Sequence, residues 1–198
     1  MVKDRAVFFD RDGTLIREVG YLYRQEQIEV LPGVPEAIRM ARRHGLRVVM
    51  VTNQSAVARG FLTENELVQI HEEIQRRLRE AEACLDGIYY CPHHPTEGIE
   101  PFRLSCSCRK PNPGMVERAS SELGLDPCRS YVVGDQISDM ALAAQVGAKG
   151  ILIEGSPLAP TGGSLDNGSP GSGTIVSVEK DCWAAVQWII RHLLLETS

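Results

Sequence analysis

The sequence predicts an α/β fold in which a doubly wound parallel sheet carries helices on both faces. Apolar runs of strand length alternate with helical patterns along the chain, and polar side chains directly follow several of these runs. A chain of 198 residues is long enough for one well-packed domain and too short for two ordinary ones. We therefore expect residues 1–198 to form a single domain.

Local patterns set the bounds of each predicted element. Short apolar runs predict the strands, and apolar residues at helical spacing with end signals predict the helices. The predicted strands cover residues 6–9, 47–51, 87–90, 131–133, 150–153 and 174–178, the last at an edge of the sheet. The predicted helices cover residues 34–43, a long helix after residue 63, then 113–124, 140–146 and 180–195.

Individual residues justify the helix ends and the buried helix faces. Thr63 and Glu66 form a capping box, and Pro113 begins a later helix. The apolar positions expected to be buried are Leu67, Ile70, Ile74 and Leu78 in the long helix, and Trp183, Val186, Ile190 and Leu194 in the closing helix. His44, His71 and His192 lie in helical stretches without an evident partner, which favours surface or helix-end positions for all three.

The segment 155–173 consists mostly of Gly, Ser and Pro. Such a composition has too few apolar groups to fold by itself. We expect a flexible surface loop there.

The segment Asp10-Arg11-Asp12-Gly13-Thr14 directly follows the first strand and places two carboxylates on a tight turn. Asp10 could attack phosphorus and form an aspartyl-phosphate, while Asp12 could serve as general acid and base. An Asp-rich loop without chemistry is the alternative for this segment alone.

Two further strand ends carry polar groups, at Thr52-Asn53 and at Asp135, with Asp139 behind it. Carboxyl ends of parallel strands are where open α/β sheets build their sites. Thr52 and the amides after it could hold phosphate oxygens, and the carboxylates offer the hard oxygen ligands that Mg²⁺ prefers. Lys110 adds a compact positive charge for the nucleophile and the phosphate.

These elements in this order resemble the haloacid dehalogenase superfamily of aspartate-nucleophile phosphatases. The resemblance implies a Rossmann-like sheet, with Asp10 as nucleophile and Asp12 as acid and base. It also implies a Mg²⁺ site made by Asp10, the backbone carbonyl of Asp12, and Asp135. The chain departs from the pattern at Gln136, where relatives often carry Lys, and at Ala56, where they often carry Gly.

A second constellation consists of Cys91, His93, Cys106 and Cys108. Two close pairs separated by a loop are typical of a tetrahedral Zn²⁺ site with thiolate and imidazole ligands, and four protein ligands indicate a structural ion. We therefore expect a zinc-stapled loop over residues 91–108. His94 could replace His93, although the spacing of Cys106 and Cys108 favours His93. A disulfide and free thiols are the alternatives.

Combined with the first motif, this cluster makes the chain resemble the heptose 1,7-bisphosphate phosphatase and histidinol-phosphatase branch of the superfamily. The length of the loop between His93 and Cys106, and the pair Gly20-Tyr21, favour a sugar bisphosphate in heptose metabolism as substrate. Arg59 and Arg109 are candidates for holding a second phosphate or sugar hydroxyls, because a guanidinium offers a fork of donors. The segments 15–31 and 91–108 are too short to hold a lid domain, so we expect a capless, open site.

Charge and hydropathy exclude other classes of protein. A net charge of −5 argues against a general nucleic-acid binder, and no apolar run approaches the length that spans a bilayer. The N-terminus lacks a signal-peptide core, so we expect a cytoplasmic monomer with no membrane or nucleic-acid partner. The competing readings are histidinol phosphate as substrate, transfer of the phosphoryl group to another alcohol, and a zinc-stapled binding module without chemistry.

Overall fold

A computed structural model describes residues 3–154 and 175–196. The loop expected at residues 155–173, and Thr174 at the start of the last predicted strand, lie outside the described residues.

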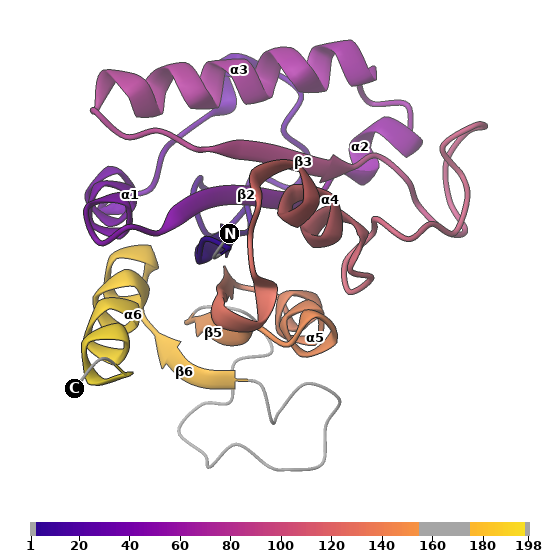
Figure 1. The fold of residues 1–198 in the computed structure, drawn as a ribbon. Helices are drawn as coiled ribbons and strands as arrows, with labels where there is room; N and C mark the ends of the chain where they lie inside the picture. Colours follow the sequence, from indigo (N-terminus) through magenta and orange to yellow (C-terminus); the bar gives the residue numbers. More distant parts are fainter. Residues whose placement is uncertain (1–2, 155–174, 197–198) are drawn as a thin grey trace.

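One parallel sheet organises the described residues (Figure 1). Its strand order is β3-β2-β1-β4-β5-β6, and every neighbouring pair is parallel. The chain therefore starts in the middle of the sheet, builds outward to one side and then crosses to the other. The strands are β1 (Ala6–Phe9), β2 (Arg47–Asn53), β3 (Gly87–Cys91), β4 (Tyr131–Gly134), β5 (Lys149–Ile153) and β6 (Ile175–Glu179).

Helices cover both faces of this sheet, as a doubly wound fold requires. The α-helices are α1 (Val34–Arg43), α2 (Ser55–Ala58), α3 (Glu64–Glu80), α4 (Gly114–Leu123), α5 (Ile137–Val146) and α6 (Cys182–Glu196). Side chains of α1, α3 and α6 pack on one face with Val7 and Phe9, and side chains of α4 and α5 pack on the other with Ala6 and Phe8. Alternate residues of the same buried strand thus serve two cores.

Most predicted elements are confirmed within one or two residues. The helix over 34–43 has the predicted bounds, the capping box at Thr63 is present, and β6 is an edge strand. Helix α5 begins at Ile137, three residues before the predicted start, because the Asp139 carboxylate accepts the N–H of Gln136 and closes a turn there. The prediction for Leu194 is wrong: it is 59% exposed, although Val186 and Ile190 of the same helix are buried.

The connections at the carboxyl edge of the sheet are short and irregular. Within the described residues, the stretch 15–31 carries only the 3-10 turn Gln25–Gln27, and 92–113 carries neither helix nor strand. No inserted lid domain is present in either stretch, as predicted from their lengths. Among the helices that the structure describes, none combines the length and the apolar character needed to cross a bilayer.

Candidate active site

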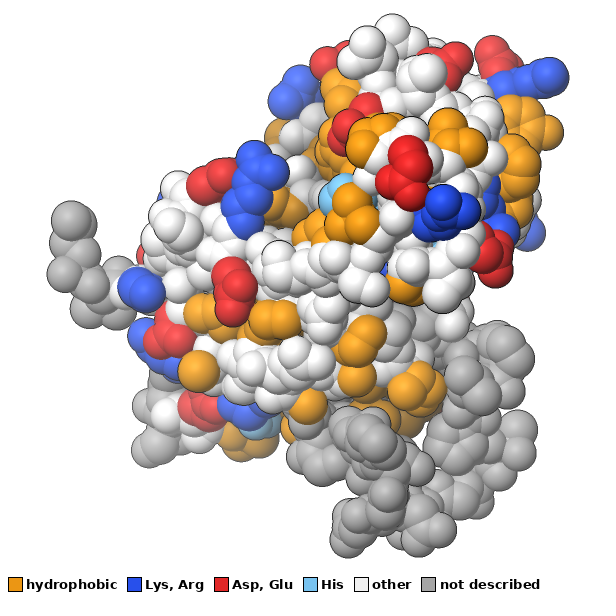
Figure 2. All heavy atoms as spheres, turned by 90° about the vertical axis from the view of Figure 1, so that its right-hand side faces the viewer, with side chains coloured by type: hydrophobic (Ala, Val, Ile, Leu, Met, Phe, Trp, Pro, Cys, Tyr) orange, Lys and Arg blue, Asp and Glu red, His pale blue; other side chains and the backbone are white. Residues whose placement is uncertain are grey.

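Three adjacent strand ends bring the predicted polar residues together. Asp10 follows β1 in the centre of the sheet, Thr52 and Asn53 end β2 on one side, and Asp135 follows β4 on the other. Figure 2 views this carboxyl edge, where apolar, acidic and basic side chains are interspersed over the surface. The strand order reverses at β1, and such a switch point is the usual binding crevice of an open α/β sheet.

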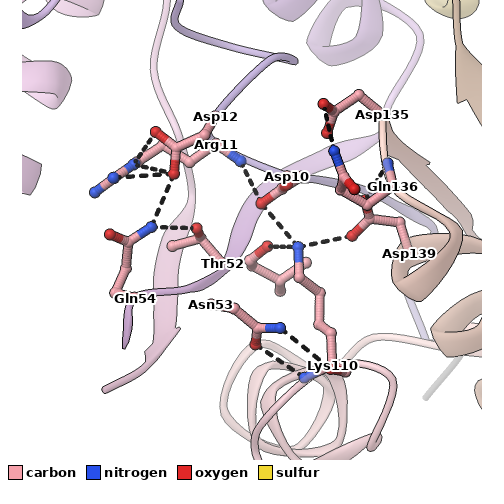
Figure 3. Close-up of polar contacts among 11 residues, drawn as sticks. Asp10, Arg11, Asp12, Thr52, Asn53, Gln54, Lys110, Asp135, Gln136 and Asp139 are labelled. Carbon is pink, nitrogen blue, oxygen red and sulfur yellow. Dashed lines mark hydrogen bonds and ion pairs between the residues drawn. The ribbon is translucent and has the colours of Figure 1, made fainter. Parts of the chain in front are cut away.

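Lys110 occupies the centre of the cluster (Figure 3). Its ammonium nitrogen lies 2.7 Å from Oδ1 of Asp10, 2.7 Å from Oδ1 of Asp139 and 3.0 Å from the carbonyl oxygen of Val51. The Lys110 side chain is 2% exposed and that of Asp139 is completely buried. Burial opposes the charged ammonium, but Asp10 and Asp139 together raise the pKa of Lys110 above its usual value. Lys110 therefore stays charged beside Asp10.

Asp12 has a separate set of partners. Nε of Arg11 donates to both oxygens of the Asp12 carboxylate at 3.1 Å, and Nη2 lies 3.0 Å from Oδ2. Nε2 of Gln54 donates to the same Oδ2 at 2.9 Å and lies 2.8 Å from Oγ1 of Thr52. The two carboxylates of the first motif thus differ in surroundings: Asp10 faces an ammonium, and Asp12 is held by a guanidinium and an amide while 20% of its side chain remains exposed.

The third carboxylate, Asp135, lies against the turn of the first motif. Gly13 has φ +72°, and a Cβ there would approach Oδ2 of Asp135 to 2.4 Å, so only glycine permits this contact. Nε2 of Gln136 donates to the same oxygen at 2.9 Å. The other oxygen, Oδ1, is buried and has no hydrogen-bond partner among the described residues. Burial, with the nearby charge of Asp10, raises the pKa of Asp135.

This arrangement fits a divalent cation. One carboxylate oxygen each from Asp10, Asp135 and Asp139 lies within 4.8 Å of the others. Three carboxylates face the single ammonium of Lys110, so the cluster has an excess of acidic groups, and the unpaired oxygen of Asp135 needs a partner. A hard cation that prefers oxygen ligands, such as Mg²⁺, would balance the negative charge and give this oxygen a partner.

Asn53 binds the loop that carries Lys110. Its Nδ2 donates to the Lys110 carbonyl at 3.1 Å, and its Oδ1 accepts the Lys110 N–H at 2.9 Å. The two amide contacts fix the backbone of Lys110 and therefore the direction of its side chain. In this structure Asn53 serves the lysine loop, whereas Thr52, which is 1% exposed, contacts Gln54.

The two predicted arginines contact residues outside the carboxylate cluster. Arg59 forms an ion pair with Glu97 and lies over the ring of Tyr21, 5.8 Å from its centroid. Arg109 donates from Nη1 to the carbonyl oxygen of His93 at 3.0 Å. Among the contacts of the described residues, none joins either guanidinium to the carboxylate cluster.

The four predicted zinc ligands do converge. Sγ of Cys91 lies 3.6 Å from Nδ1 of His93 and 3.5 Å from Sγ of Cys106, and Sγ of Cys108 lies 3.4 Å from Nδ1 of His93 and 3.3 Å from Sγ of Cys106. These separations are too long for a disulfide, whose sulfurs lie about 2 Å apart. They are near the edge of a tetrahedron around an ion with metal–sulfur bonds of about 2.3 Å. The cluster could hold a metal ion through His93, and His94 is not part of it.

Comparison with known proteins identifies the family. A family model described as "Haloacid dehalogenase-like hydrolase" matches residues 7–79, and a second model of HAD-like hydrolases matches residues 107–157. The D-glycero-beta-D-manno-heptose-1,7-bisphosphate 7-phosphatase of Escherichia coli strain K12 is 44% identical over 157 residues, which cover 78% of this chain and 82% of that enzyme. The chain belongs to the haloacid dehalogenase-like hydrolases. It is a phosphatase of this family, in the branch of the heptose 1,7-bisphosphate phosphatases, as its motifs predicted.

Further relatives of this haloacid dehalogenase-like phosphatase agree in sequence and in fold. The enzyme of the same name from Haemophilus influenzae is 43% identical over 74% of this chain and 78% of its own length. The D,D-heptose 1,7-bisphosphate phosphatase of B. bronchiseptica, solved with magnesium and phosphate, has a TM-score of 0.78 and 28% identity and covers 95% of this chain and 99% of that one. An HAD-like phosphatase from Mesorhizobium loti is 35% identical, with a TM-score of 0.74, over 77% of this chain and 74% of that one.

Sequence reasoning missed three residues at this phosphatase site: Arg11, Gln54 and His71. Arg11 is 1% exposed and Gln54 is 4% exposed, and both contact Asp12. Each stands directly beside a predicted site residue, which is a signal that was available. His71 was expected at a surface or helix end, but it is 4% exposed, and its Nε2 lies 3.2 Å from Nη1 of Arg11. No local pattern could indicate that contact, because it joins positions 60 residues apart.

Proposed function

We propose that this chain removes the C7 phosphate of D-glycero-D-manno-heptose 1,7-bisphosphate through an aspartyl-phosphate intermediate. The choice of substrate rests on the 44% identity, over most of both chains, to the D-glycero-beta-D-manno-heptose-1,7-bisphosphate 7-phosphatase of Escherichia coli. The cluster of Asp10, Asp12 and Lys110 supports the chemistry, because it supplies a nucleophile, an acid and base, and a fixed positive charge.

In the first step, a carboxylate oxygen of Asp10 attacks phosphorus while the bond from phosphorus to the C7 oxygen breaks. Asp12 donates a proton to that departing oxygen, so the sugar leaves as an alcohol and Asp12 becomes a carboxylate. In the second step, Asp12 takes a proton from water as the water oxygen attacks phosphorus and the bond between phosphorus and the Asp10 oxygen breaks, which releases inorganic phosphate and restores the Asp10 carboxylate. Lys110, the Thr52 hydroxyl and backbone amides after β2 stabilise the charge on the transferring group.

Two metal ions belong to this proposal. Asp10, the backbone carbonyl of Asp12, and Asp135 would hold Mg²⁺, which when bound neutralises charge on the phosphoryl oxygens. Cys91, His93, Cys106 and Cys108 would hold a structural Zn²⁺ that makes the loop 91–108 rigid. We include the whole chain, residues 1–198, in one phosphatase domain.

The second phosphate and the sugar need partners outside the carboxylate cluster. We assign Arg109 and Arg59 to this task, and Asn53 to the phosphate loop. The guanidinium of Arg109 donates to the His93 carbonyl and that of Arg59 pairs with Glu97, so both contact the segment 91–108, which the metal cluster would make rigid. A guanidinium in a fixed position can bind a phosphate by two parallel hydrogen bonds.

A comparison of substrates tests the function. We expect kcat/KM for D-glycero-D-manno-heptose 1,7-bisphosphate to exceed that for histidinol phosphate by at least about tenfold, which is about 1.4 kcal/mol of transition-state stabilisation. Phosphate release in the presence of Mg²⁺ is the measurement, with both anomers of the heptose assayed. Equal or reversed specificity would assign the chain to histidinol phosphate, and absence of phosphate release from every ester would favour a binding module.

A further inference from the structure

His71 connects helix α3 to the acid and base of the active site through one intervening side chain. The guanidinium of Arg11 uses Nε and Nη2 on the Asp12 carboxylate and presents its remaining terminal nitrogen, Nη1, to Nε2 of His71 at 3.2 Å. Arg11 has 2% of its side chain exposed, so water cannot easily replace either partner.

The contact defines the state of the histidine ring. An arginine nitrogen has hydrogens to donate and no lone pair to accept with, so Nε2 of His71 must accept and the ring proton must reside on Nδ1. A protonated ring would place two cations side by side in a buried region. Burial, with the charge of Arg11, lowers the pKa of His71 to about 3, which keeps the ring neutral at the pH of an assay.

The surroundings keep the ring in place. His71 is flanked on α3 by Ile70 and Ile74, which are at most 2% exposed, and its ring packs on Tyr90 with centroids 5.3 Å apart. Tyr90 is in turn fixed by a hydrogen bond from its hydroxyl to Glu64 at 3.1 Å. The acceptor nitrogen therefore sits on a rigid element, and a rigid support is what orients a group for proton transfer.

We propose that His71 is a positioning residue for the reaction: its Nε2 lone pair fixes the Arg11 guanidinium, whose fork fixes the Asp12 carboxylate in the direction of the leaving oxygen. This role rests on the proposed function, since it presupposes that Asp12 is the general acid. Without His71, Arg11 loses its contact on the side away from Asp12, and Asp12 keeps Arg11 and Gln54 as partners but loses the fixed position of the guanidinium.

The test compares two variants with two kinds of ester. His71→Gln keeps an acceptor at about the reach of Nε2, whereas His71→Asn keeps a polar group that is too short to reach Arg11. An alkyl ester, the heptose bisphosphate or glycerol 3-phosphate, needs a proton on its leaving oxygen, but p-nitrophenyl phosphate does not. The value of kcat/KM includes only steps up to the aspartyl-phosphate, so it isolates the protonation of the leaving group.

For His71→Asn we expect kcat/KM on the alkyl ester to fall about tenfold or more, and kcat/KM on p-nitrophenyl phosphate to stay within about threefold of the parent. On p-nitrophenyl phosphate, kcat and KM should fall together, because activation of water in the second step still needs Asp12. His71→Gln should restore most of the alkyl activity. Asp12→Asn serves as the positive control, and Gln75→Leu, one turn further along α3, serves as the control that retains the parental ratio of activities.

Equal losses on both esters would overturn the role of His71. So would His71→Asn and His71→Gln variants with the same activities, provided that thermal denaturation curves show both to be folded. If His71→Asn does not fold, Arg11→Lys provides the second measurement, because lysine keeps the charge without the fork and should give the same selective loss. A parent active on glycerol 3-phosphate but inactive on the heptose bisphosphate would contradict the proposed substrate alone, since the ratio of activities is still measured on glycerol 3-phosphate.

Discussion

The ammonium of Lys110 and Oδ1 of Asp10 are 2.7 Å apart at a site where both side chains are at least nine-tenths buried. The same ammonium is bound by Asp139, and Asn53 holds the Lys110 backbone from the end of β2. One buried lysine thus contacts groups at the ends of the central strands, and we expect its removal to lower both stability and activity.

Replacing this lysine by methionine, which has a similar shape and no charge, should lower the free energy of unfolding by about 3 to 5 kcal/mol, because two buried carboxylates lose their counter-charge. Lys149→Met is the matched control. Lys149 pairs with Glu196 at 2.8 Å with a third of its side chain exposed, so we expect less than about 1 kcal/mol there. Urea denaturation without added Mg²⁺ measures both values, and similar losses in the two variants would contradict the central role of Lys110.

Asp10→Asn should abolish turnover while leaving the protein folded, because an amide keeps the shape of the side chain but cannot attack phosphorus. We expect less than about one percent of the parental rate of phosphate release, with little change in the thermal midpoint. Retention of a larger rate by the purified variant would show that another group attacks phosphorus.

The cysteine cluster predicts about one zinc per chain in the purified protein. Cys106→Ser should lower the zinc content and destabilise the loop 91–108 before it affects Mg²⁺ binding, because thiolate ligands couple metal binding to folding. Cys128→Ser is the control, since Cys128 is exposed and lies outside the cluster. Elemental analysis decides the matter: folded, active, zinc-free protein with reactive thiols at Cys91, Cys106 and Cys108 would exclude a structural zinc.

Arg109→Ala should reduce the preference for the heptose bisphosphate over histidinol phosphate, chiefly by lowering kcat/KM for the bisphosphate, because it removes a fixed donor for the second phosphate. Zinc content must be measured alongside, since Arg109 also contacts the His93 carbonyl. A variant that retains its zinc and its full substrate preference would mean that the second phosphate binds elsewhere.

His71 gives the protein a pH dependence whose sign follows from burial. The ring has an ordinary pKa of 6.5 when unfolded and about 3 when folded, so the unfolded chain binds the proton more tightly. The contribution to stability is complete above pH 6.5 and is lost as pH falls from 6.5 toward 3, at up to about 1.4 kcal/mol per pH unit.

His71→Leu lacks this titration, so the free energies of unfolding of parent and variant should converge by roughly 2 kcal/mol between pH 7 and pH 5. Urea denaturation at the two pH values provides the measurement. For Gln75→Leu, which changes no titrating group, the difference from the parent should stay constant. A gap between parent and His71→Leu that is the same at both pH values would contradict a neutral, buried ring.

The sequence by itself determined the alternation of elements, most of their bounds and the strand ends that carry Asp10, Thr52 and Asp135. These features are local, because apolar spacing and end signals depend on a few neighbouring residues. Parallel strands also bring their carboxyl ends to one edge of the sheet, whatever the packing of the helices between them. The convergence of Cys91, His93, Cys106 and Cys108 could be predicted for the same reason, because two close pairs at the ends of one loop are a local pattern.

Tertiary structure alone decided which groups these residues meet. Lys110 reaches Asp139 as well as Asp10, Asp12 turns to Arg11 and Gln54, and His71 lies inside the core although its helix pattern placed it outside. Leu194 has the spacing of a buried residue, yet it lies exposed near the end of α6. Each outcome depends on how one element lies in space relative to another that is distant in the chain. The periodicity within a single element carries no information about that arrangement.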